Sequence, residues 1–520
     1  MEEQIRGIVP RKIRGFRDID PKMNLLRWKI VNAAAKIYQS FGFEHWDTPI
    51  LEFADCLGKY MPDSDTVEQG VYSFKNPEQD PVFDNKGKEM RTIDNDVVME
   101  NHFLSLRYDL TAPLARNYAE RLWLLNLRGQ VSASNPPLFR RYQFGPVFRY
   151  EAKLDPGRFR EFWQVDFDTV GTADVAADAE VCIVLTKALE EIGLKKDSFF
   201  VKVNNRKILS GFLESVGVND KTEEKNILRI IDKVDKIGIE GVALELGKGR
   251  EEKSGAFIDG LGLPAEMILS ITNFFGLFSQ RFSREEVLEK LSQIINNNLL
   301  ANEGVQELHK MNLMFKALNF DDSQIVFDPT LVRGMAYYTG PIFEVESLMT
   351  YKDSKGTSRK VGSICGGGRY DGLVENLLGL KVPATGASIG VDRLAELLTL
   401  AENDKTEAFG AVLIAVFDDS AMNEYQKIAA ELRNAGVNTE VYYGAGKNLK
   451  KQFAYADKKN SPIVIMAGED EMLRNSVTIK DLVLGKQMDN IQNKEEWRAK
   501  VQFEVSRNEM VQKVKEILNR

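Results

Sequence analysis

The sequence predicts an α+β fold in which a helical module interrupts the core and a separate α/β domain ends the chain. Two long strands joined by a polar loop are expected over residues 139–171. Residues 205–322 instead carry helical patterns rich in Lys, Glu, Ile and Leu. From about residue 409, apolar strand-like runs alternate with helical ones, as in a small parallel α/β domain.

Length and composition are those of an ordinary globular protein, and 520 residues suggest about three domains. No apolar run of about 18 residues is present, so no membrane span is expected. The amino terminus lacks the apolar region of a secretory signal. Three widely separated cysteines favour a reducing compartment, and we expect a cytoplasmic location. A net charge of −8 gives no general attraction to nucleic acid, so RNA binding would need local patches.

The first part of the chain alternates between helix and strand signals. Asp20 and Pro21 are typical of a helix start, and Gly42 ends that helix. Residues 43–50 (FEHWDTPI) look like a strand. Residues 104–116 look like a strand, a turn and a helix, with Asp109 and Thr111 at the turn. Polar residues at such a turn either cap the helix or serve a function, and both readings stay open.

The stretch 139–171 has an unusual distribution of charge. Because strand side chains alternate with period two, Arg149 and Glu151 share one side of the first strand. One face of the second strand carries Arg158, Arg160, Gln164, Asp166 and Asp168. This face is either solvated or a binding face. A binding face would offer arginines to an anion at one end, and an amide and carboxylates to a cationic or hydrogen-bonding group at the other.

Sheet-like sequence resumes at residue 325 after the helical module. Three consecutive glycines, 366–368, permit positive φ and close approach of a ligand, or form a hairpin turn. Residues 384–398 read as a glycine-bearing strand that leads into a helix. Arg393 in the first turn of that helix opposes the helix dipole, and a bound phosphate would reverse the sign of that effect. A chance arginine at a short junction is the alternative.

The C-terminal α/β domain contains neither GxGxxG nor GxxxxGK[ST], so no nucleotide-binding loop is expected there. Its lysines form either a basic patch or a solvated helix face; they are Lys447, Lys450, Lys451, Lys458 and Lys459. Residues 495–520 are expected to be a helical tail that faces solvent.

The unusual polar residues come from distant parts of the chain, and strands could bring them into one cleft. They are Arg149, Arg158, Arg333, Arg393, Asp109, Thr111, Gln164, Asp168, Tyr337 and Tyr338. Several arginines beside glycine-rich backbone suit a nucleotide held without a phosphate loop. Phosphoryl or nucleotidyl transfer fits such a site, because fixed guanidinium groups stabilise charge that grows on phosphorus oxygens. The carboxylates and the amide would receive an amine-bearing substrate.

Several motifs then resemble a known family. Arg149 in its strand-loop-strand, GASIGVDR and FEHWDTPI are similar to the three motifs of class II aminoacyl-tRNA synthetases. RGMAYYTG and GGGRYDGL resemble stretches specific to histidyl-tRNA synthetases within that class. The likeness covers most of residues 10–400, and the motifs occur in the family's order. The C-terminal domain resembles that family's anticodon-binding domain.

The resemblance implies a fold and an activity. An antiparallel sheet would form a catalytic core from residues 1–204 and 323–402, with 205–322 as an insertion domain and 405–520 as the anticodon-binding-like domain. The enzyme would be a homodimer that joins L-histidine and ATP to histidyl-adenylate and pyrophosphate. It would then transfer the histidyl group to tRNA(His). Magnesium would bridge the ATP phosphates, without a metal site built from protein ligands.

The resemblance also implies roles for individual residues. Histidine would be bound by Asp109, Leu110, Thr111, Arg149, Gln164, Asp168, Arg333, Tyr337, Tyr338 and Tyr370. ATP would be bound by Arg149, Glu151, Arg158 and Arg393. Arg149 and Arg333 would be catalytic, at the carboxylate and α-phosphate. Asp168 and Tyr338 would read the imidazole, which offers two nitrogens and can carry a positive charge.

The sequence departs from the family's pattern at two places. Ala336 stands where the family usually has an acidic residue directly before Tyr337 and Tyr338, which removes a support for that loop. The loop AKLDPG between the two long strands differs from forms associated with the best-known bacterial members. This loop commonly touches the tRNA acceptor end, so the acceptor features that are read stay open.

Two other functions are compatible with the same sequence. The chain could be a non-catalytic paralogue that binds histidine or RNA and regulates another protein. It keeps both the arginine of RGxxYYTG and the C-terminal domain, which regulatory relatives tend to lose, so the enzyme is favoured. The C-terminal domain could also bind a protein partner instead of an anticodon.

Overall fold

The computed structural model divides into two compact units, Met1–Asn403 and Asp404–Arg520. None of the helices in the described part of the chain is long and apolar enough to cross a membrane. The structure describes residues 10–58, 70–84, 87–100, 102–129, 136–150, 154, 158–251, 255–295, 298–332, 338–352, 356–372, 374–400, 410–445, 448–487 and 500–519.

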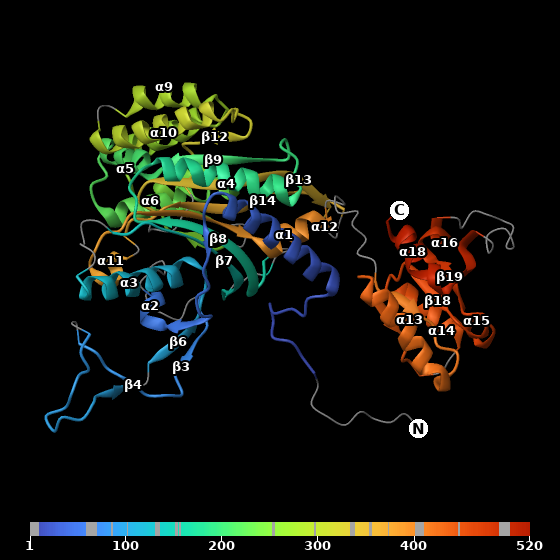
Figure 1. The fold of residues 1–520 in the computed structure, drawn as a ribbon. Coiled ribbons are helices and arrows are strands. Elements are labelled where there is room, and N and C mark those ends of the chain that lie inside the picture. Colours follow the sequence, from blue (N-terminus) through green and yellow to red (C-terminus); the bar gives the residue numbers. More distant parts are fainter. Residues whose placement is uncertain are drawn as a thin grey trace. The chain divides into compact units, whose positions relative to one another are not determined.

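The first unit is built on an eight-stranded sheet with the order β1-β7-β8-β15-β14-β13-β9-β12 (Figure 1). Inner neighbours run antiparallel, and only the edge pairs β1–β7 and β12–β9 are parallel. The predicted α+β class with an antiparallel core is therefore confirmed. The strands are β1 (Glu44–His45), β7 (Phe139–Phe148), β8 (Glu161–Val170), β9 (Phe199–Asn205), β12 (Ile325–Phe327), β13 (Pro341–Lys352), β14 (Ser358–Arg369) and β15 (Ala384–Gly390).

Three helices cover one face of this sheet: α1 (Pro21–Ser40), α4 (Ala176–Ile192) and α12 (Val391–Leu400). Helix α1 begins as predicted, because the Asp20 carboxylate accepts the N–H of Met23 at 2.8 Å. On β8, Val165 and Phe167 are fully buried beneath the helices. The ring centroids of Phe167 and Tyr38 of α1 are 4.5 Å apart. The alternate residues of β8 therefore face the other side of the sheet.

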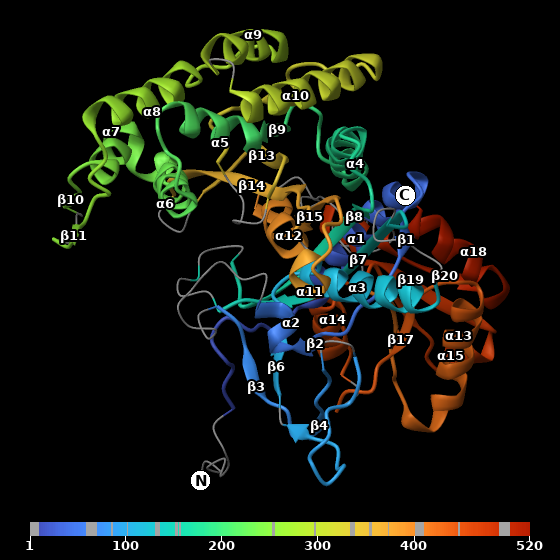
Figure 2. The same cartoon turned by 90° about the vertical axis from the view of Figure 1, so that its left-hand side faces the viewer.

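Smaller elements lie beside this core. The long helix α3 (Thr111–Leu127) follows a three-stranded sheet, and a narrow hairpin extends from that sheet in both views (Figures 1 and 2). The remaining elements of this part are α2 (Ala54–Gly58), β2 (Leu51–Phe53), β3 (Ser73–Lys75), β4 (Asp80–Pro81), β5 (Met99–Glu100) and β6 (Phe103–Leu106). The strand predicted over residues 43–50 is too long. Only Glu44–His45 pairs with β7, and the chain then leaves the sheet as Thr48 and Pro49 approach.

The segment between β9 and β12 is mostly helical and gathers at one end of the sheet (Figure 2). Its chain leaves from β9 and returns to it, because β12 and β13 pair with β9 on either side. The elements are α5 (Arg206–Ser215), α6 (Lys221–Ile231), α7 (Val234–Leu246), β10 (Arg250–Glu251), β11 (Phe257–Ile258), α8 (Ala265–Leu277), α9 (Arg284–Ile294) and α10 (Leu299–Ala317). The segment can thus be accommodated without changing the strand order of the main sheet.

The second unit contains a five-stranded sheet with the order β17-β16-β18-β19-β20. The first three strands are parallel, as the alternating pattern predicts, whereas β19 and β20 are antiparallel additions. The main elements are β16 (Val412–Ile414), α13 (Met422–Asn434), β17 (Thr439–Val441), α14 (Leu449–Lys458), β18 (Ile463–Met466), α15 (Glu469–Leu473), β19 (Ser476–Asp481), α16 (Leu482–Gln487), β20 (Gln502–Ser506) and α18 (Arg507–Leu518).

The C-terminal tail is helical over residues 507–518, as predicted, but the prediction that it faces solvent is wrong. Residues 502–506 form β20, which pairs with β19 along its length. In α18, Met510, Val514 and Ile517 are buried in the core of the second unit. Their spacing of three and four residues is that of an apolar helix stripe, which is the signal that the prediction overlooked.

The buried position of α18 leads to a stability prediction. Met510→Ala should lower the stability of the second unit by about 2–5 kcal/mol, because it leaves a cavity in a closed core. Hydrogen exchange followed by mass spectrometry on the full chain would show faster exchange in β16, β18 and β19. Lys515→Ala, an exposed position on the same helix, is the control. Equal exchange in the two variants would contradict the packing of α18.

Candidate active site

A cavity of about 370 Å³ opens on the face of β8 that the helices leave free. It is lined from β8, β14 and β15, from the turn before α3 and from the start of α12. The predicted site residues that line it are Asp109, Thr111, Arg149, Arg158, Gln164, Asp168, Tyr338, Tyr370 and Arg393. Glu151, Arg333 and Tyr337, with the neighbouring Ala336, lie outside the described residues. Leu110 is fully buried, and its carbonyl accepts Nη2 of Arg141 at 2.7 Å.

At one end of the cavity Asp168 is held by two partners. The Tyr370 hydroxyl donates to its Oδ1, and Arg141 of β7 forms an ion pair with its Oδ2 at 3.1 Å. Both Asp168 and Arg141 are almost completely buried. Burial raises the pKa of Asp168, and the Arg141 guanidinium lowers it. The arrangement gives a buried carboxylate whose charge is matched from behind by one arginine.

Gln164 and Asp166 continue the same face of β8 along the cavity. Nε2 of Gln164 donates to the Ser388 hydroxyl at 2.7 Å, and Ser388 is paired with Asp166 in the register of β8 and β15. Burial, followed by the charge of Asp168, raises the pKa of Asp166 to about 8. This end of the cavity is therefore rich in hydrogen-bond acceptors.

Asp109 caps helix α3, which is one of the two roles that the sequence left open, and its functional role stays a prediction. Its Oδ1 accepts the N–H groups of Thr111 at 3.0 Å and Ala112 at 2.9 Å, so it caps α3. It also lines the cavity, together with Thr111. Burial raises the pKa of Asp109, whereas the Ala112 N–H and the Arg149 charge lower it. The cap fixes a carboxylate in the cavity wall.

The other end of the cavity carries guanidinium groups. Nε of Arg149 donates to the Tyr108 carbonyl at 2.9 Å, and its guanidinium lies 5.3 Å from the Phe162 ring centre. Nη2 of Arg393, in the first turn of α12, donates to the Val361 carbonyl at 3.0 Å. Arg158 lines the same space and is exposed. Three positive charges at one end suit a polyanionic ligand.

The glycine run has neither the positive φ nor the hairpin turn that its sequence permits, whereas the close approach of a ligand stays a prediction. Glycines 366–368 lie within β14, between β13 and β15, and none has a positive φ. A Cβ on Gly366 would be 3.9 Å from the Phe343 carbonyl oxygen, an ordinary contact, and this glycine lines the cavity. A Cβ on Gly368 would come within 2.9 Å of the Tyr338 ring. A Cβ on Gly386 of β15 would collide with Oδ1 of Asp168. Because these glycines have no Cβ, they leave room on the surface of the sheet for the side chains of Tyr338 and Asp168 and for a ligand.

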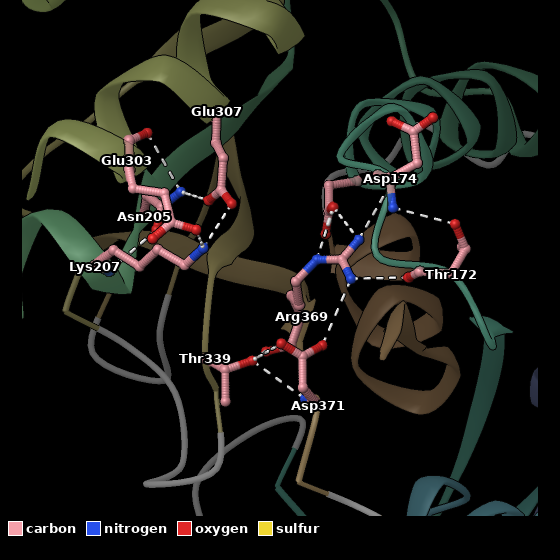
Figure 3. Close-up of polar contacts among 11 residues, drawn as sticks. Thr172, Asp174, Asn205, Lys207, Glu303, Glu307, Thr339, Arg369 and Asp371 are labelled. Carbon is pink, nitrogen blue, oxygen red and sulfur yellow. Dashed lines mark hydrogen bonds and ion pairs between the residues drawn. The ribbon is translucent and has the colours of Figure 1, made fainter. Parts of the chain in front are cut away.

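Behind the cavity, Arg369 connects the end of β14 to the start of α4 (Figure 3). Its Nε donates to Oδ2 of Asp178 at 2.9 Å, and its Nη1 donates to the Thr172 carbonyl at 3.0 Å. The next polar side chain, Asp371, accepts the Thr339 hydroxyl at 2.9 Å. Tyr370 lies between these two anchors in sequence, and Tyr338 directly precedes Thr339. The network thus holds the backbone from which both tyrosines enter the cavity.

A family model described as "Histidyl-tRNA synthetase" matches residues 90–394, which is more than half of the chain. The chain belongs to the histidyl-tRNA synthetase family. A second model, "Anticodon binding domain", matches residues 411–517.

The sequence similarity to individual members of this family extends over almost the full length of both chains. "Histidine--tRNA ligase" of Ruegeria sp. (strain TM1040) is 42% identical over 517 residues, covering 99% of this chain and 96% of that protein. The protein of the same name from Paracoccus denitrificans is 42% identical over 506 residues, covering 97% of each. The crystal structure of histidyl-tRNA synthetase from Nostoc sp. PCC 7120 superposes with a TM-score of 0.69 at 27% identity, covering 98% of this chain and 100% of that one.

Sequence reasoning missed several residues of this site. Arg141 has no assigned role in the motifs, yet it contacts both Asp168 and the Leu110 carbonyl. Counting back from Arg149 with period two reaches Arg141, so the strand pattern contained the signal. Ser388 and Gly386 face Asp166 and Asp168 only through the register of β8 with β15. That register joins positions more than 200 residues apart and cannot be read from local pattern.

The buried pair of Arg369 and Asp178 allows a test of the support network. Asp178→Ala should destabilise the first unit by about 3–5 kcal/mol, because it leaves a buried guanidinium without its carboxylate. The double variant Asp178→Leu with Arg369→Met should cost much less, since no charge is left unpaired. Urea unfolding of the full chain measures both. A double variant as unstable as the single one would contradict the pairing.

Proposed function

We propose that the chain is a histidine–tRNA ligase. It activates L-histidine with ATP to histidyl-adenylate and pyrophosphate, and then transfers the histidyl group to tRNA(His) for protein synthesis. The observation that carries this proposal is a single cavity with acceptors at one end and guanidinium groups at the other, in a chain related over its full length to proteins named histidine–tRNA ligase.

The acceptor end suits the amino acid. Asp109, Thr111 and Gln164 hold the α-amino group, and Asp168 reads the imidazole with Tyr338. The hydroxyl of Tyr370 already donates to Asp168, so the carboxylate is oriented before the substrate binds. A side chain with two ring nitrogens can meet both a carboxylate and a tyrosine. Tyr337 closes the pocket with Tyr370.

The guanidinium end suits ATP. Arg149 and Arg333 face the substrate carboxylate and the α-phosphate, where the new bond forms, and Arg393 meets the γ-phosphate. Glu151 and Arg158 lie near the nucleotide. Negative charge grows on the α-phosphate oxygens during attack, and Arg149, which already donates to the Tyr108 carbonyl, stabilises it without reorganising.

We propose that magnesium enters the site bound to the phosphates of ATP, and not at a metal site formed by the protein. No cluster of three or more His, Cys, Asp or Glu side chains that could hold a metal ion occurs among the described residues. Magnesium is usually held by phosphate oxygens with one or two carboxylates. The carboxylates that line this cavity lie at its amino-acid end, so we assign no protein ligand to the ion.

The remaining parts of the proposal concern partners. The second unit, which matches an anticodon-binding model, binds the tRNA anticodon, and the exposed Lys450, Lys451, Lys458 and Lys459 of the α14 region are candidates for phosphate contacts. The enzyme acts as a homodimer in the cytoplasm. Three widely separated cysteines, with no pairing pattern in the sequence, support this location.

Histidine-dependent exchange of pyrophosphate into ATP tests the function directly. Exchange that requires histidine, and no other amino acid, is the expected result. A folded chain that binds histidine without exchange would instead be a regulatory paralogue.

A first variant tests the arginine end. Arg333→Ala should abolish exchange while leaving the unfolding midpoint unchanged, because the side chain is expected to serve the transition state and not the core. Arg128→Ala, an exposed arginine at the end of α3, is the control. Exchange at the wild-type rate in Arg333→Ala would rule out the catalytic role.

A second variant tests the amino-acid end. Asp168→Ala should raise the KM for histidine by roughly 10- to 100-fold, as expected when a charged hydrogen-bond partner is lost. The KM for ATP should change little, because ATP is bound at the other end of the cavity. Both constants come from the exchange assay. Equal losses for the two substrates would mean that Asp168 does not read the histidine side chain.

A further inference from the structure

Asp166 is a carboxyl group in the cavity wall to which no motif assigns a role. It lies on β8 between Gln164 and Asp168 and shares their face of the sheet, with 2% of its surface exposed. Ser388 of β15 is opposite it and hydrogen-bonds to its carboxyl group. Ionisation of a carboxyl group at this buried position is energetically unfavourable unless a partner stabilises the charge.

Asp166 has fewer hydrogen-bond and ion-pair partners than Asp168, its neighbour on the same strand face. Asp168 has both the Tyr370 hydroxyl and the ion pair with Arg141. Asp166 has only Ser388, and its Oδ1 is buried without a hydrogen-bond partner. Oε1 of Gln164 is also buried without a partner. Oδ2 of Asp168 also lacks a hydrogen bond, but it has the Arg141 guanidinium at 3.1 Å. These oxygens of Gln164 and Asp166, two residues that line the cavity, have neither a donor nor an ion pair among the described residues.

We propose that Asp166, together with Gln164, binds the α-ammonium group of the amino-acid substrate. This inference rests on the proposed function and adds a residue to its amino-acid site. An ammonium group brings three N–H donors and one positive charge. It therefore satisfies the two unpartnered oxygens and brings a positive charge to a carboxyl group that lacks the arginine ion pair of Asp168. The imidazole goes to Asp168, whose charge is already matched.

The electrostatic surroundings support this assignment. The pKa of Asp166 is raised to about 8, first by burial and then by the charge of Asp168. Among the other charged groups that act on Asp166, Asp109 has the same sign as Asp168, whereas Arg141 and Arg107 have the opposite sign. The Tyr38 hydroxyl of α1 also interacts with it electrostatically. Near neutral pH the empty site thus holds a protonated carboxyl. When the ammonium binds, the carboxyl O–H bond breaks and its proton leaves to solvent, while the ammonium keeps its three hydrogens.

The test uses the full chain with the variant Asp166→Asn, which keeps the shape and removes the charge. We expect the KM for histidine in pyrophosphate exchange to rise by roughly 10- to 100-fold, with the KM for ATP changed little. Two inhibitors separate the ends of the amino acid: histidinol keeps the ammonium group, and imidazolepropionate keeps the ring and lacks it. The variant should bind histidinol more weakly by a similar factor and imidazolepropionate as the wild type does.

Two further readouts keep a folding defect apart from a binding defect. Because folding raises the pKa of Asp166, ionising it opposes folding, and the stability that it contributes falls as the pH rises from about 4 to 8. Asp166→Asn should therefore be at least as stable as the wild type. The difference in unfolding free energy between the two should increase from about pH 4 to 8 and stay constant at higher pH. Glu245→Gln makes the same chemical change at a buried carboxylate of α7, paired with Lys233 and Arg250, and should leave every KM unchanged.

Each outcome decides a different point. An unchanged KM for histidine in Asp166→Asn, with normal wild-type exchange, would overturn this inference and leave the proposed function standing. Imidazolepropionate weakened as much as histidinol would overturn it too, because the carboxyl group would then serve the ring. Failure of the wild type to bind histidine at all would overturn both.

Discussion

The structure depends on strand β8, which is buried on both faces and carries apolar side chains on one face and polar or charged side chains on the other. Val165 and Phe167 of β8 enter the apolar core beneath α1, while Gln164, Asp166 and Asp168 form the wall of the cavity. A shift of one residue in the pairing of β8 would place carboxylates in the core and aromatic rings in the cavity. The apolar packing that stabilises the sheet therefore also sets the register of the site.

Because these carboxylates are buried, each needs an ion-pair or hydrogen-bond partner close to it. Arg141 reaches Asp168 from the neighbouring strand, and the N-terminal N–H groups of α3 reach Asp109. At the other end, backbone carbonyls of Tyr108 and Val361 hold Arg149 and Arg393. The site is thus positioned by β8, β15 and α12, and by residues that stand directly beside the ends of strands and helices, such as Asp109, Arg149 and Tyr370. Groups held in place in this way can stabilise charge without reorganisation.

Much of this site could be predicted because its residues lie in recognisable local contexts. Arg149 ends a long strand, Asp109 precedes a helix, and Arg393 opens one, so each carries a signal of its own. Arg141 and Ser388 look ordinary in sequence, since their importance comes from what lies across the sheet. The glycine run gives a weaker signal, because glycine is compatible with both turns and extended backbone, and only the pairing of β14 with β13 and β15 shows that residues 366–368 are extended. In the C-terminal unit, the apolar stripe of α18 was present but was outweighed by the charge around it.

The closure of the cavity has a consequence for how the protein is made. Gln164 and Ser388 touch across a sequence separation of 224 residues, and β15 must be in place before β8 has its second neighbour. While the ribosome is still producing the helical segment, β8 has only β7 beside it and the acidic wall is open to water. Nascent chains shorter than about 390 residues have no complete pocket. Premature termination upstream of β15 should thus yield inert fragments, never partly active ones, and assembly of the long-range sheet should be the slow step of maturation.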